Sequence, residues 1–334
     1  MRLHDARGRP LHDLRISVTD RCNLRCTYCM PREAFGPEHP FLPREALLTF
    51  EEIRDVVVAL GPLGLRKIRL TGGEPLLRRD IEHLVALLRN ALPEVDLALT
   101  TNGVLLPNKA VDLAAAGLDR VTVSLDAFDP TTYAAMADVD HGPESALKGI
   151  QAALDAGLKV KVNCVVQAGT NEDEVLPLLR HFGPQGIVVR YIEYMDVGAT
   201  NDWSMGAVLP GSSLRTRIAE SHGPLTALEA SSPNDVARRW RTSEGWTFGC
   251  IDSVTAPFCG GCSRARLSAN GSMFTCLFAE DGHPLLPLLR NGASAEDLRA
   301  AIRSVWQARK DAYSEQRSQG KGREGRVEMS FIGG

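Results

Sequence analysis

The sequence predicts an α/β protein: an incomplete (β/α)6 TIM-like barrel over residues 1–210, followed by a smaller C-terminal α+β domain over residues 211–334. Short β-branched segments alternate with amphipathic helical segments six times up to about residue 195. Repeated β/α units indicate a parallel sheet with right-handed crossovers. Because a closed barrel of this type has eight units, six units predict a barrel with one open side. The alternation stops after Met195.

The six strands are predicted over residues 14–19, 65–71, 95–101, 120–125, 158–166 and 187–194. Two of the helices between them carry clear signals. Thr49 and Glu52 form a capping box ahead of an apolar series, which is typical of a helix N-terminus. Residues 79–92 place apolar side chains at helical spacing.

The second half of the chain is organised differently. Residues 197–211 are rich in Gly, Asn and small residues and predict a loop. A short helix, a polar segment and short strands follow. The Asn270-Gly271 pair predicts a β-hairpin made of residues 266–269 and 273–276. A last helix is expected over about residues 294–310.

The composition predicts a soluble, cytoplasmic protein with a sizeable core. Of the 334 residues 44% are hydrophobic, and the net charge is -3. A chain this close to neutrality argues against bulk electrostatic binding to nucleic acid. The N-terminus has no apolar stretch of signal-peptide length, and no window approaches the ~20 apolar residues that span a bilayer. We therefore expect neither nucleic acid nor a membrane as a partner.

The eight cysteines point to metal or cluster ligation, because disulfides are rare in a reducing compartment. Cys22, Cys26 and Cys29 have the spacing C-x3-C-x2-C directly after the first predicted strand. Three thiolates on one loop can hold three irons of a [4Fe–4S] cluster and leave the fourth iron open for a ligand. A structural zinc site with a distant fourth ligand is the alternative.

A second group, Cys259, Cys262 and Cys276, has the spacing C-x2-C-x13-C. Taken alone, this group fits a zinc knuckle as a serious alternative. Its pairing with the first group favours a second [4Fe–4S] cluster, whose open iron would bind the substrate directly. Cys164 and Cys250 stand singly among apolar residues and are expected to be buried structural thiols.

The first cysteine group and the segment Thr71-Gly72-Gly73-Glu74-Pro75 resemble the signature motifs of the radical S-adenosylmethionine superfamily. The resemblance implies that the open iron chelates the amino and carboxylate groups of S-adenosylmethionine, which one electron cleaves to methionine and a 5′-deoxyadenosyl radical. It implies that Tyr28 contacts the adenine and that the glycine segment holds the methionine amino group. The implied cofactor-binding residues are Tyr28, Gly72, Gly73, Glu74, Ser124 and Met195.

Further segments are similar to those of the MoaA-type GTP 3′,8-cyclases, which begin molybdenum cofactor biosynthesis. These segments are LRISVTDRCNLRCTYCMP, KIRLTGGEPLLRRDI, LTTNG, VSLDAFDP, RYIEYM, FCGGCSRARLSANGSMFTCLF and the terminal MSFIGG. The resemblance implies a lyase with two [4Fe–4S] clusters. In its reaction the deoxyadenosyl radical takes the 3′ hydrogen of GTP, and the ribosyl radical attacks carbon 8 of guanine to give 3′,8-cyclo-7,8-dihydro-GTP.

Polar residues alternate with apolar ones on four predicted strands, which puts each polar set on one face. The sets are Arg15, Ser17 and Thr19, then Lys67, Arg69 and Thr71, then Lys159, Lys161 and Asn163, and finally Arg190. Cations gathered inside a barrel repel one another unless an anion offsets them. A triphosphate carries that charge, and arginine suits bidentate phosphate contact. The alternative is that these faces point to solvent on an open edge of the sheet.

The resemblance and the cationic faces together predict the substrate contacts. The predicted GTP-binding residues are Arg15, Lys67, Arg69, Thr100, Lys161, Arg190, Arg264, Ala265 and Arg266. The resemblance also implies that Arg264, Arg266 and the terminal Gly333-Gly334 assist the chemistry. It implies an electron donor, not identified here, and a downstream cyclic pyranopterin monophosphate synthase. A homodimer is a further hypothesis.

Two other functions fit parts of the pattern. Another two-cluster radical enzyme, for example one that modifies a peptide, would need a peptide groove in place of the phosphate-binding cations. A non-catalytic electron carrier or zinc-stabilised binding protein would need neither the GGEP segment nor an open iron.

Overall fold

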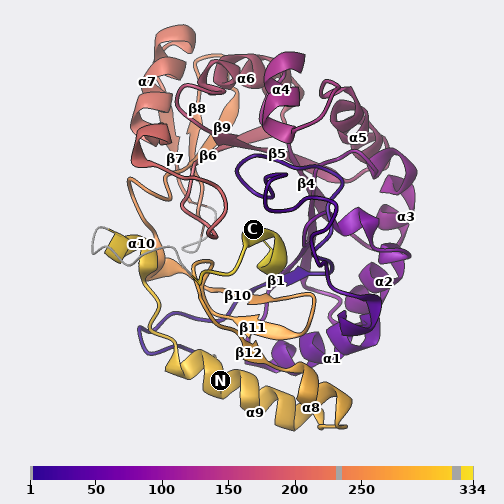
Figure 1. Ribbon diagram of the computed structural model, residues 1–334. Coiled ribbons are helices and arrows are strands. Elements are labelled where there is room, and N and C mark those ends of the chain that lie inside the picture. The colour runs from indigo at the N-terminus through magenta and orange to yellow at the C-terminus, as the bar shows by residue number, and fades with distance from the viewer. Residues whose placement is uncertain (1–2, 231–234, 318–324, 334) are drawn as a thin grey trace.

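The computed structural model describes residues 3–230, 235–317 and 325–333, and its framework is one sheet that curves into an open barrel (Figure 1). The sheet has twelve strands in the order β12-β11-β10-β1-β2-β3-β4-β5-β6-β9-β8-β7. The six predicted strands are confirmed, with ends that differ by at most two residues. They are β1 (Asp13–Ser17), β2 (Lys67–Thr71), β3 (Asp96–Thr101), β4 (Arg120–Ser124), β5 (Lys159–Val166) and β6 (Val188–Glu193).

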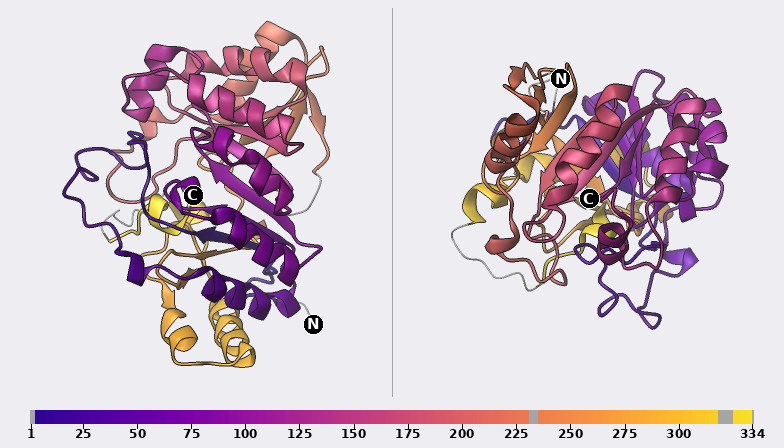
Figure 2. Two further views of the ribbon diagram at one scale, coloured as in Figure 1. Left: turned by 90° about the vertical axis from the view of Figure 1, so that its right-hand side faces the viewer. Right: turned by 90° about the horizontal axis from the view of Figure 1, so that it is seen from above.

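Helices cover the outer face of these strands (Figures 1 and 2). Both helices with clear sequence signals are confirmed, and α1 begins at the reciprocal capping box of Thr49 and Glu52. The helices of this half are α1 (Phe50–Leu60), α2 (Ile81–Ala91), α3 (Ala110–Ala115), α4 (Pro130–Ala137), α5 (Glu144–Asp155) and α6 (Val175–Phe182).

The main hydrophobic core lies between the sheet and these helices. Leu14 and Ile16 on β1, like Ile68 and Leu70 on β2, are buried in one cluster with the apolar faces of the helices. Because side chains alternate along a strand, the residues between them face the inside of the barrel. The inner face is therefore polar, as the alternation predicts, and it encloses a cavity rather than a packed core.

The C-terminal half lengthens the same sheet at both edges. The strand β10 (Arg264–Leu267) pairs parallel with β1, and β9 (Thr247–Ile251) pairs parallel with β6. Eight neighbouring strands are thus parallel, and an antiparallel pair extends each edge. These outer strands are β11 (Ser272–Phe274) and β12 (His283–Pro284) beyond β10, and β8 (Arg238–Arg241) and β7 (Thr226–Leu228) beyond β9.

The Asn270-Gly271 hairpin is confirmed between β10 and β11, which pair antiparallel. Cys276 lies two residues beyond β11 rather than on it. The C-terminal residues do not form a separate sheet, because their strands join both edges of the barrel. The domain boundary at residue 210 stays a prediction.

Five α-helices lie among the described residues of this half, and the predicted last long helix is confirmed as α9. They are α7 (Gly211–His222), α8 (Leu286–Arg290), α9 (Ala295–Ala308), α10 (Tyr313–Gln316) and α11 (Met329–Ile332). Figure 1 shows α9 along the outside of the barrel beside α1, and α11 in the middle of the ring of strands. None of the helices among the described residues has the length and apolar character that a bilayer span requires.

The close packing of α5 on the loop after β3 can be tested at Gly149, in the middle of α5. A Cβ atom there would lie 2.1 Å from the carbonyl oxygen of Gly103. Replacing a mid-helix glycine by alanine normally stabilises a helix by ~1 kcal/mol. Here the added methyl group would force α5 away from the Gly103 carbonyl, and such overpacking costs about 1–3 kcal/mol. We expect Gly149→Ala to lower the free energy of unfolding in an anaerobic denaturant titration. The exposed Lys148→Ala should change it by less than about 0.5 kcal/mol, and a stabilised Gly149→Ala would contradict the packing.

Candidate active site

One cavity inside the ring of strands brings together most of the predicted site residues. Both cysteine trios line it, with residues from the carboxyl ends of the parallel strands and from the C-terminal segments. The other predicted residues in its wall are Arg15, Tyr28, Arg69, Gly72, Gly73, Glu74, Thr100, Ser124, Arg190, Met195, Arg264 and Arg266. The carboxyl ends of parallel barrel strands are where active sites of such folds lie.

The first cysteine trio lies on the loop that follows β1. The loop is held by its own backbone, since the amides of Cys29 and Met30 both donate to the Cys26 carbonyl at 2.9 Å. Burial raises the pKa of the Cys26 and Cys29 thiols, and the carboxylate of Asp126 near both raises it further. Burial also raises the pKa of Cys22, to about 11. Thiolates on this loop are therefore costly until a cation binds them.

The two glycines after β2 are required because their segment packs on the backbone of the cysteine loop. A Cβ atom on Gly73 would lie 2.3 Å from the Arg21 carbonyl oxygen, and one on Gly72 would lie 2.5 Å from that of Thr19. Gly72 also has a φ of 149°, which favours glycine. The amides of Gly73 and Glu74 donate to the Thr19 and Arg21 carbonyls, each at 2.8 Å. This segment therefore fixes the position of the cysteine loop.

Glu74 ties the end of β2 to the end of β3. One carboxylate oxygen accepts from the Leu76 amide at 2.9 Å and from the Thr101 hydroxyl at 2.8 Å, and the other accepts from the Asn102 amide at 2.8 Å. Burial raises the pKa of Glu74 to about 7, although these hydrogen bonds oppose the shift. A positive group placed beside it would favour the charged form.

Asp126 plays a similar part beside the first trio, and the sequence analysis does not identify it as a site residue. Its carboxylate accepts from the Tyr28 hydroxyl at 2.6 Å and from the Val165 amide at 2.8 Å. Burial raises the pKa of Asp126 to about 6. The position of Asp126 just beyond the end of β4 is the signal that points to it, because polar side chains there face the open end of the barrel.

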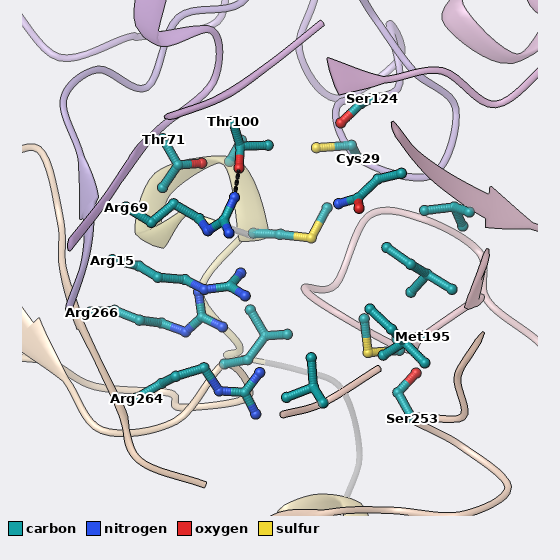
Figure 3. Close-up of a pocket in the computed structure, with 18 of the residues that line it drawn as sticks. Arg15, Cys29, Arg69, Thr71, Thr100, Ser124, Met195, Ser253, Arg264 and Arg266 are labelled. Carbon is teal, nitrogen blue, oxygen red and sulfur yellow. Dashed lines mark hydrogen bonds between the residues drawn. The ribbon is translucent and has the colours of Figure 1, made fainter. Parts of the chain in front are cut away.

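Three arginines from different parts of the chain lie side by side on the inner face. The pairing register places Arg15 of β1 level with Arg69 of β2 on one side and with Arg266 of β10 on the other. Figure 3 shows their guanidinium groups, with that of Arg264, stacked along one wall and facing Met195 across the cavity. We call Arg15, Arg69 and Arg266 the arginine row.

The partners that the structure gives the arginine row are neutral. Arg69 donates to the hydroxyls of Thr100 at 2.6 Å and Thr122 at 3.1 Å, and Arg266 donates to the carbonyl of Gly333. Burial, followed by the charges of nearby arginines, lowers the pKa of Arg15 to about 9 and that of Arg69 to about 9. The row is therefore held under electrostatic repulsion that a bound anion would relieve.

Three predicted GTP contacts lie away from the cavity wall. The side chain of Ala265 is fully buried in the core behind the sheet, so only its backbone can serve a ligand. Lys67 lies level with Asp13 and Asp96 near the amino ends of the strands. Lys161 is not among the residues that line the cavity, and it lies level with Thr122 on the inner face.

Arginines contact the second trio at Cys262, whereas at Cys276 burial raises the thiol pKa to about 11 and the nearby carboxylate of Asp311 adds to the shift. The Cys262 sulfur accepts from Arg309 Nη2 at 3.2 Å and from Arg264 Nη2 at 3.5 Å. Burial alone would raise the pKa of Cys262, but the charges of Arg264 and Arg309 lower it to about 6. This thiol is therefore ready to bind a metal near neutral pH. Arg309 and Arg9, which also lines the cavity, follow no pattern in the sequence that would identify them.

Within the described residues, no three His, Cys, Asp or Glu side chains converge as the ligands of one metal ion would. Each cysteine of a [4Fe–4S] cluster binds a different iron, so its ligands need not meet at one point. Cys164 and Cys250 are buried, as predicted.

The C-terminal tail (residues 325–333) enters the cavity and is fixed at two points. Arg326 Nη1 donates to the Asp196 carbonyl at 2.7 Å and to its carboxylate at 3.2 Å. Glu328 accepts from the Ala199 amide at 3.0 Å. Met329 and Ser330 then line the cavity.

At the end of this tail, Gly333 has a φ of 76° and could not carry a side chain, since a Cβ atom would lie 2.3 Å from Thr71 Cγ2. Its carbonyl meets Arg266. Gly334, which the sequence analysis also assigns to the site, lies outside the described residues.

Comparisons with known proteins agree with this architecture. Residues 16–182 match the family model described as "Radical SAM superfamily", and residues 187–315 match "Molybdenum Cofactor Synthesis C". A protein named GTP 3′,8-cyclase from Acidothermus cellulolyticus is 50% identical over 323 residues, which cover 95% of this chain and 89% of that protein. One of the same name from Xanthomonas axonopodis pv. citri is 46% identical over 334 residues, covering 99% of each.

Among solved structures, Streptococcus suis SuiB bound to S-adenosylmethionine is similar with a TM-score of 0.62 at 15% identity, covering 89% of this chain and 69% of SuiB. Methylornithine synthase is similar with a TM-score of 0.51 at 16% identity, covering 65% of this chain and 62% of that one. At these identities the likeness concerns the fold alone, and it confirms the predicted class.

The attachment of the tail can be tested through Asp196. Its carboxylate also accepts from the Tyr313 hydroxyl at 2.5 Å and from Arg317 Nε at 2.9 Å, and removing one partner of a buried ion pair costs roughly 3–5 kcal/mol. We expect Asp196→Asn to release the tail and to speed trypsin cleavage after the buried Arg326 at least about tenfold. A loss of about 1.4 kcal/mol in the free energy that holds the tail in place already gives that factor. Mass spectrometry of the C-terminal peptides measures this rate. Cleavage after the exposed Arg79 is the internal reference, and equal acceleration at both sites would contradict a local attachment.

Proposed function

Because this chain belongs to the radical SAM superfamily and, within it, to the family of the GTP 3′,8-cyclases, we propose that it converts GTP into 3′,8-cyclo-7,8-dihydro-GTP, the first step of molybdenum cofactor biosynthesis. The observation that carries the proposal is the match to curated GTP 3′,8-cyclases at 46% to 50% identity over nearly the whole chain. The arginine row inside a cavity lined by both cysteine trios supports an anionic substrate there.

As a radical SAM protein, the chain uses S-adenosylmethionine and an iron–sulfur cluster. We propose Cys22, Cys26 and Cys29 as the cluster ligands, since they are free thiols on one short loop that line the cavity. Bound together, the cluster and S-adenosylmethionine supply the carbon radical that removes the 3′ hydrogen of the substrate. The residues proposed to hold S-adenosylmethionine are Tyr28, Gly72, Gly73, Glu74, Ser124 and Met195.

A second [4Fe–4S] cluster at Cys259, Cys262 and Cys276 is a separate proposal. The lowered pKa of the Cys262 thiol supports it, because a cluster needs deprotonated ligands. The three residues line the same cavity as the first trio. A ligand in this cavity would therefore be in reach of both trios.

The arginine row and Arg264 are proposed to bind and orient the substrate. We propose that the triphosphate lies along the arginine row and Arg264, where its negative charge would offset the burial and the repulsion between arginines that together lower the pKa of Arg15 and Arg69. Arg190 and Thr100 complete this wall, while Lys67 and Lys161 add positive charge from below it. Fixing the ribose relative to the cofactor is the main contribution that a protein makes to such a reaction.

The C-terminal tail is proposed to act from the inner side of the cavity. The contact between the Gly333 carbonyl and Arg266 supports a role for the tail in orienting that guanidinium. The tail also covers part of the cavity through Met329 and Ser330, which would limit the access of water to a reactive intermediate.

The reaction implies further partners. An electron donor must supply the electron that starts each turnover, and we propose that a cyclic pyranopterin monophosphate synthase takes up the product. A homodimer and a cytoplasmic location remain hypotheses from the sequence. A peptide-modifying function is less well supported, because the arginine row fits a phosphate chain better than a peptide backbone.

The substrate assignment predicts a nucleotide-dependent formation of 5′-deoxyadenosine. Anaerobically reconstituted protein with S-adenosylmethionine and dithionite should form it faster with GTP than with ATP, as measured by chromatography. Arg266→Ala should weaken the response to GTP by roughly tenfold or more, because a charge-assisted hydrogen bond to a phosphate contributes about 1.5–3 kcal/mol. Arg79→Ala, whose side chain is 93% exposed, is the control that should match the parent. Equal stimulation by both nucleotides would contradict the GTP assignment.

The two-cluster proposal predicts the metal content. Reconstituted protein should contain about eight irons per chain, four in each [4Fe–4S] cluster. Replacing Cys259, Cys262 and Cys276 by alanine should leave about four, whereas replacing Cys164 and Cys250 by alanine should leave all of them. Iron and zinc analysis with absorption spectroscopy measures the result. A colourless parent protein that contains zinc would overturn the assignment.

A further inference from the structure

A buried carboxylate near the N-terminus joins two arginines that both reach the second cysteine trio. The side chain of Asp5 is fully buried and pairs with Arg9 Nε at 2.6 Å and with Arg309 Nη1 at 3.2 Å. Both guanidinium groups are at least 98% buried, with exposures of 2% and 1%. Groups so deeply buried are expensive unless they are paired and hydrogen-bonded, so their remaining contacts are informative.

Most of those remaining contacts go to the loop that carries the second trio. The others go to Asp311, whose carbonyl accepts from Arg9 Nη1 at 2.7 Å and whose carboxylate lies 3.4 Å from Arg309 Nε. Arg9 Nη1 donates to the carbonyl of Cys259 at 2.9 Å. Arg309 Nη1 donates to the carbonyl of Cys262 at 2.7 Å, and its Nη2 donates to the Cys262 sulfur at 3.2 Å. One arginine therefore holds both the backbone and the ligand atom of the same cysteine.

The fork of Arg309 is itself held rigidly. The Asp5 carboxylate accepts from Nη1 of the Arg309 guanidinium, and Cζ of Arg309 lies 4.5 Å from the ring centroid of Trp306. The indole of Trp306 is fully buried and donates to the Arg9 carbonyl at 3.1 Å. The N-terminal segment, the end of α9 and the cysteine loop are thus connected through one guanidinium.

The first trio differs in the donors to its sulfur atoms. The donors to the Cys22 sulfur are neutral, the Leu24 amide at 3.5 Å and the Asn102 amide group at 4.0 Å. The charges that act on the thiols of this trio are mixed, since the carboxylates of Glu74 and Asp126 raise the thiol pKa and Arg25 lowers that of Cys22. Cationic donors to a cluster sulfur are therefore a feature of the second trio.

The reduction potential of a cluster depends on net charge and on hydrogen bonds to its sulfur ligands. One-electron reduction of [4Fe–4S]2+ to [4Fe–4S]1+ adds negative charge, which a guanidinium at a ligand sulfur stabilises. We propose that Arg309, positioned by Asp5, raises the reduction potential of a [4Fe–4S] cluster held by Cys259, Cys262 and Cys276. This inference rests on the second cluster of the proposed function. It makes Arg309 a positioning and tuning residue that acts through Cys262.

The test uses the full-length chain with Cys22, Cys26 and Cys29 replaced by alanine, so that one cluster is measured alone. Reconstituted protein is titrated with dithionite, which supplies the electron, and the reduced cluster is followed by electron paramagnetic resonance. We expect Arg309→Gln to shift the midpoint potential to a lower value. Arg309→Lys, which keeps the charge but not the fork, should shift it less. Arg303→Gln, an exposed change on α9, the helix that ends just before Arg309, should leave it unchanged.

The iron content of the proteins shows whether a negative result contradicts the second cluster or only the effect of Arg309 on its potential. If the parent of this series binds no iron, the proposed second cluster is wrong, whatever Arg309 does. If parent and variants each bind about four irons and the potential of Arg309→Gln equals or exceeds that of the parent, the tuning role is wrong and the second cluster stands. If Arg309→Gln loses its iron, Arg309→Lys is compared with the parent instead. A midpoint potential of Arg309→Lys equal to or higher than that of the parent would then overturn the proposal.

Discussion

The arrangement of the site depends on one electrostatic constraint, the packing of Arg15, Arg69 and Arg266 side by side inside the barrel. Burial lowers the pKa of Arg15 and Arg69, and the charges of nearby arginines lower it further. Folding provides neutral acceptors, the hydroxyl of Thr100 and the carbonyl of Gly333. Within the described residues these acceptors satisfy hydrogen bonds without adding a negative charge, and a bound anion would offset the positive charge of the row.

The sheet produces this arrangement by joining distant parts of the chain. Because β10 pairs parallel with β1, Arg266 stands next to Arg15 although 250 residues separate them in sequence. The same pairing brings the loop of Cys259 and Cys262 to the cavity that the first trio lines. Both chain ends then approach this loop or cavity, the N-terminal segment through Arg9 and the tail through Gly333.

Much of this was predictable from the sequence, and the parts that were not share a physical reason. Local periodicity located the six barrel strands, and the spacing of the cysteines identified both trios. The hairpin signal at Asn270-Gly271 gave the pairing of β10 with β11, but no local signal indicates that β10 also pairs with β1. The roles of Asp5 and Arg309 come from contacts across about 300 residues. The glycines of the GGEP segment were expected to serve a ligand, whereas sterically they are required by the backbone of the cysteine loop.

The distribution of charge also suggests how the cavity sorts its two ligands. Glu74 and Asp126 lie on the side of the first trio, and burial raises the pKa of both to about 7 and about 6. S-adenosylmethionine carries a positive sulfonium group, and a cation beside these carboxyls would favour their charged forms. On the side of the second trio, Arg264 and the arginine row are positively charged and would attract an anion. We infer that this distribution of charge favours a cationic ligand beside the first trio and an anionic ligand beside the arginine row.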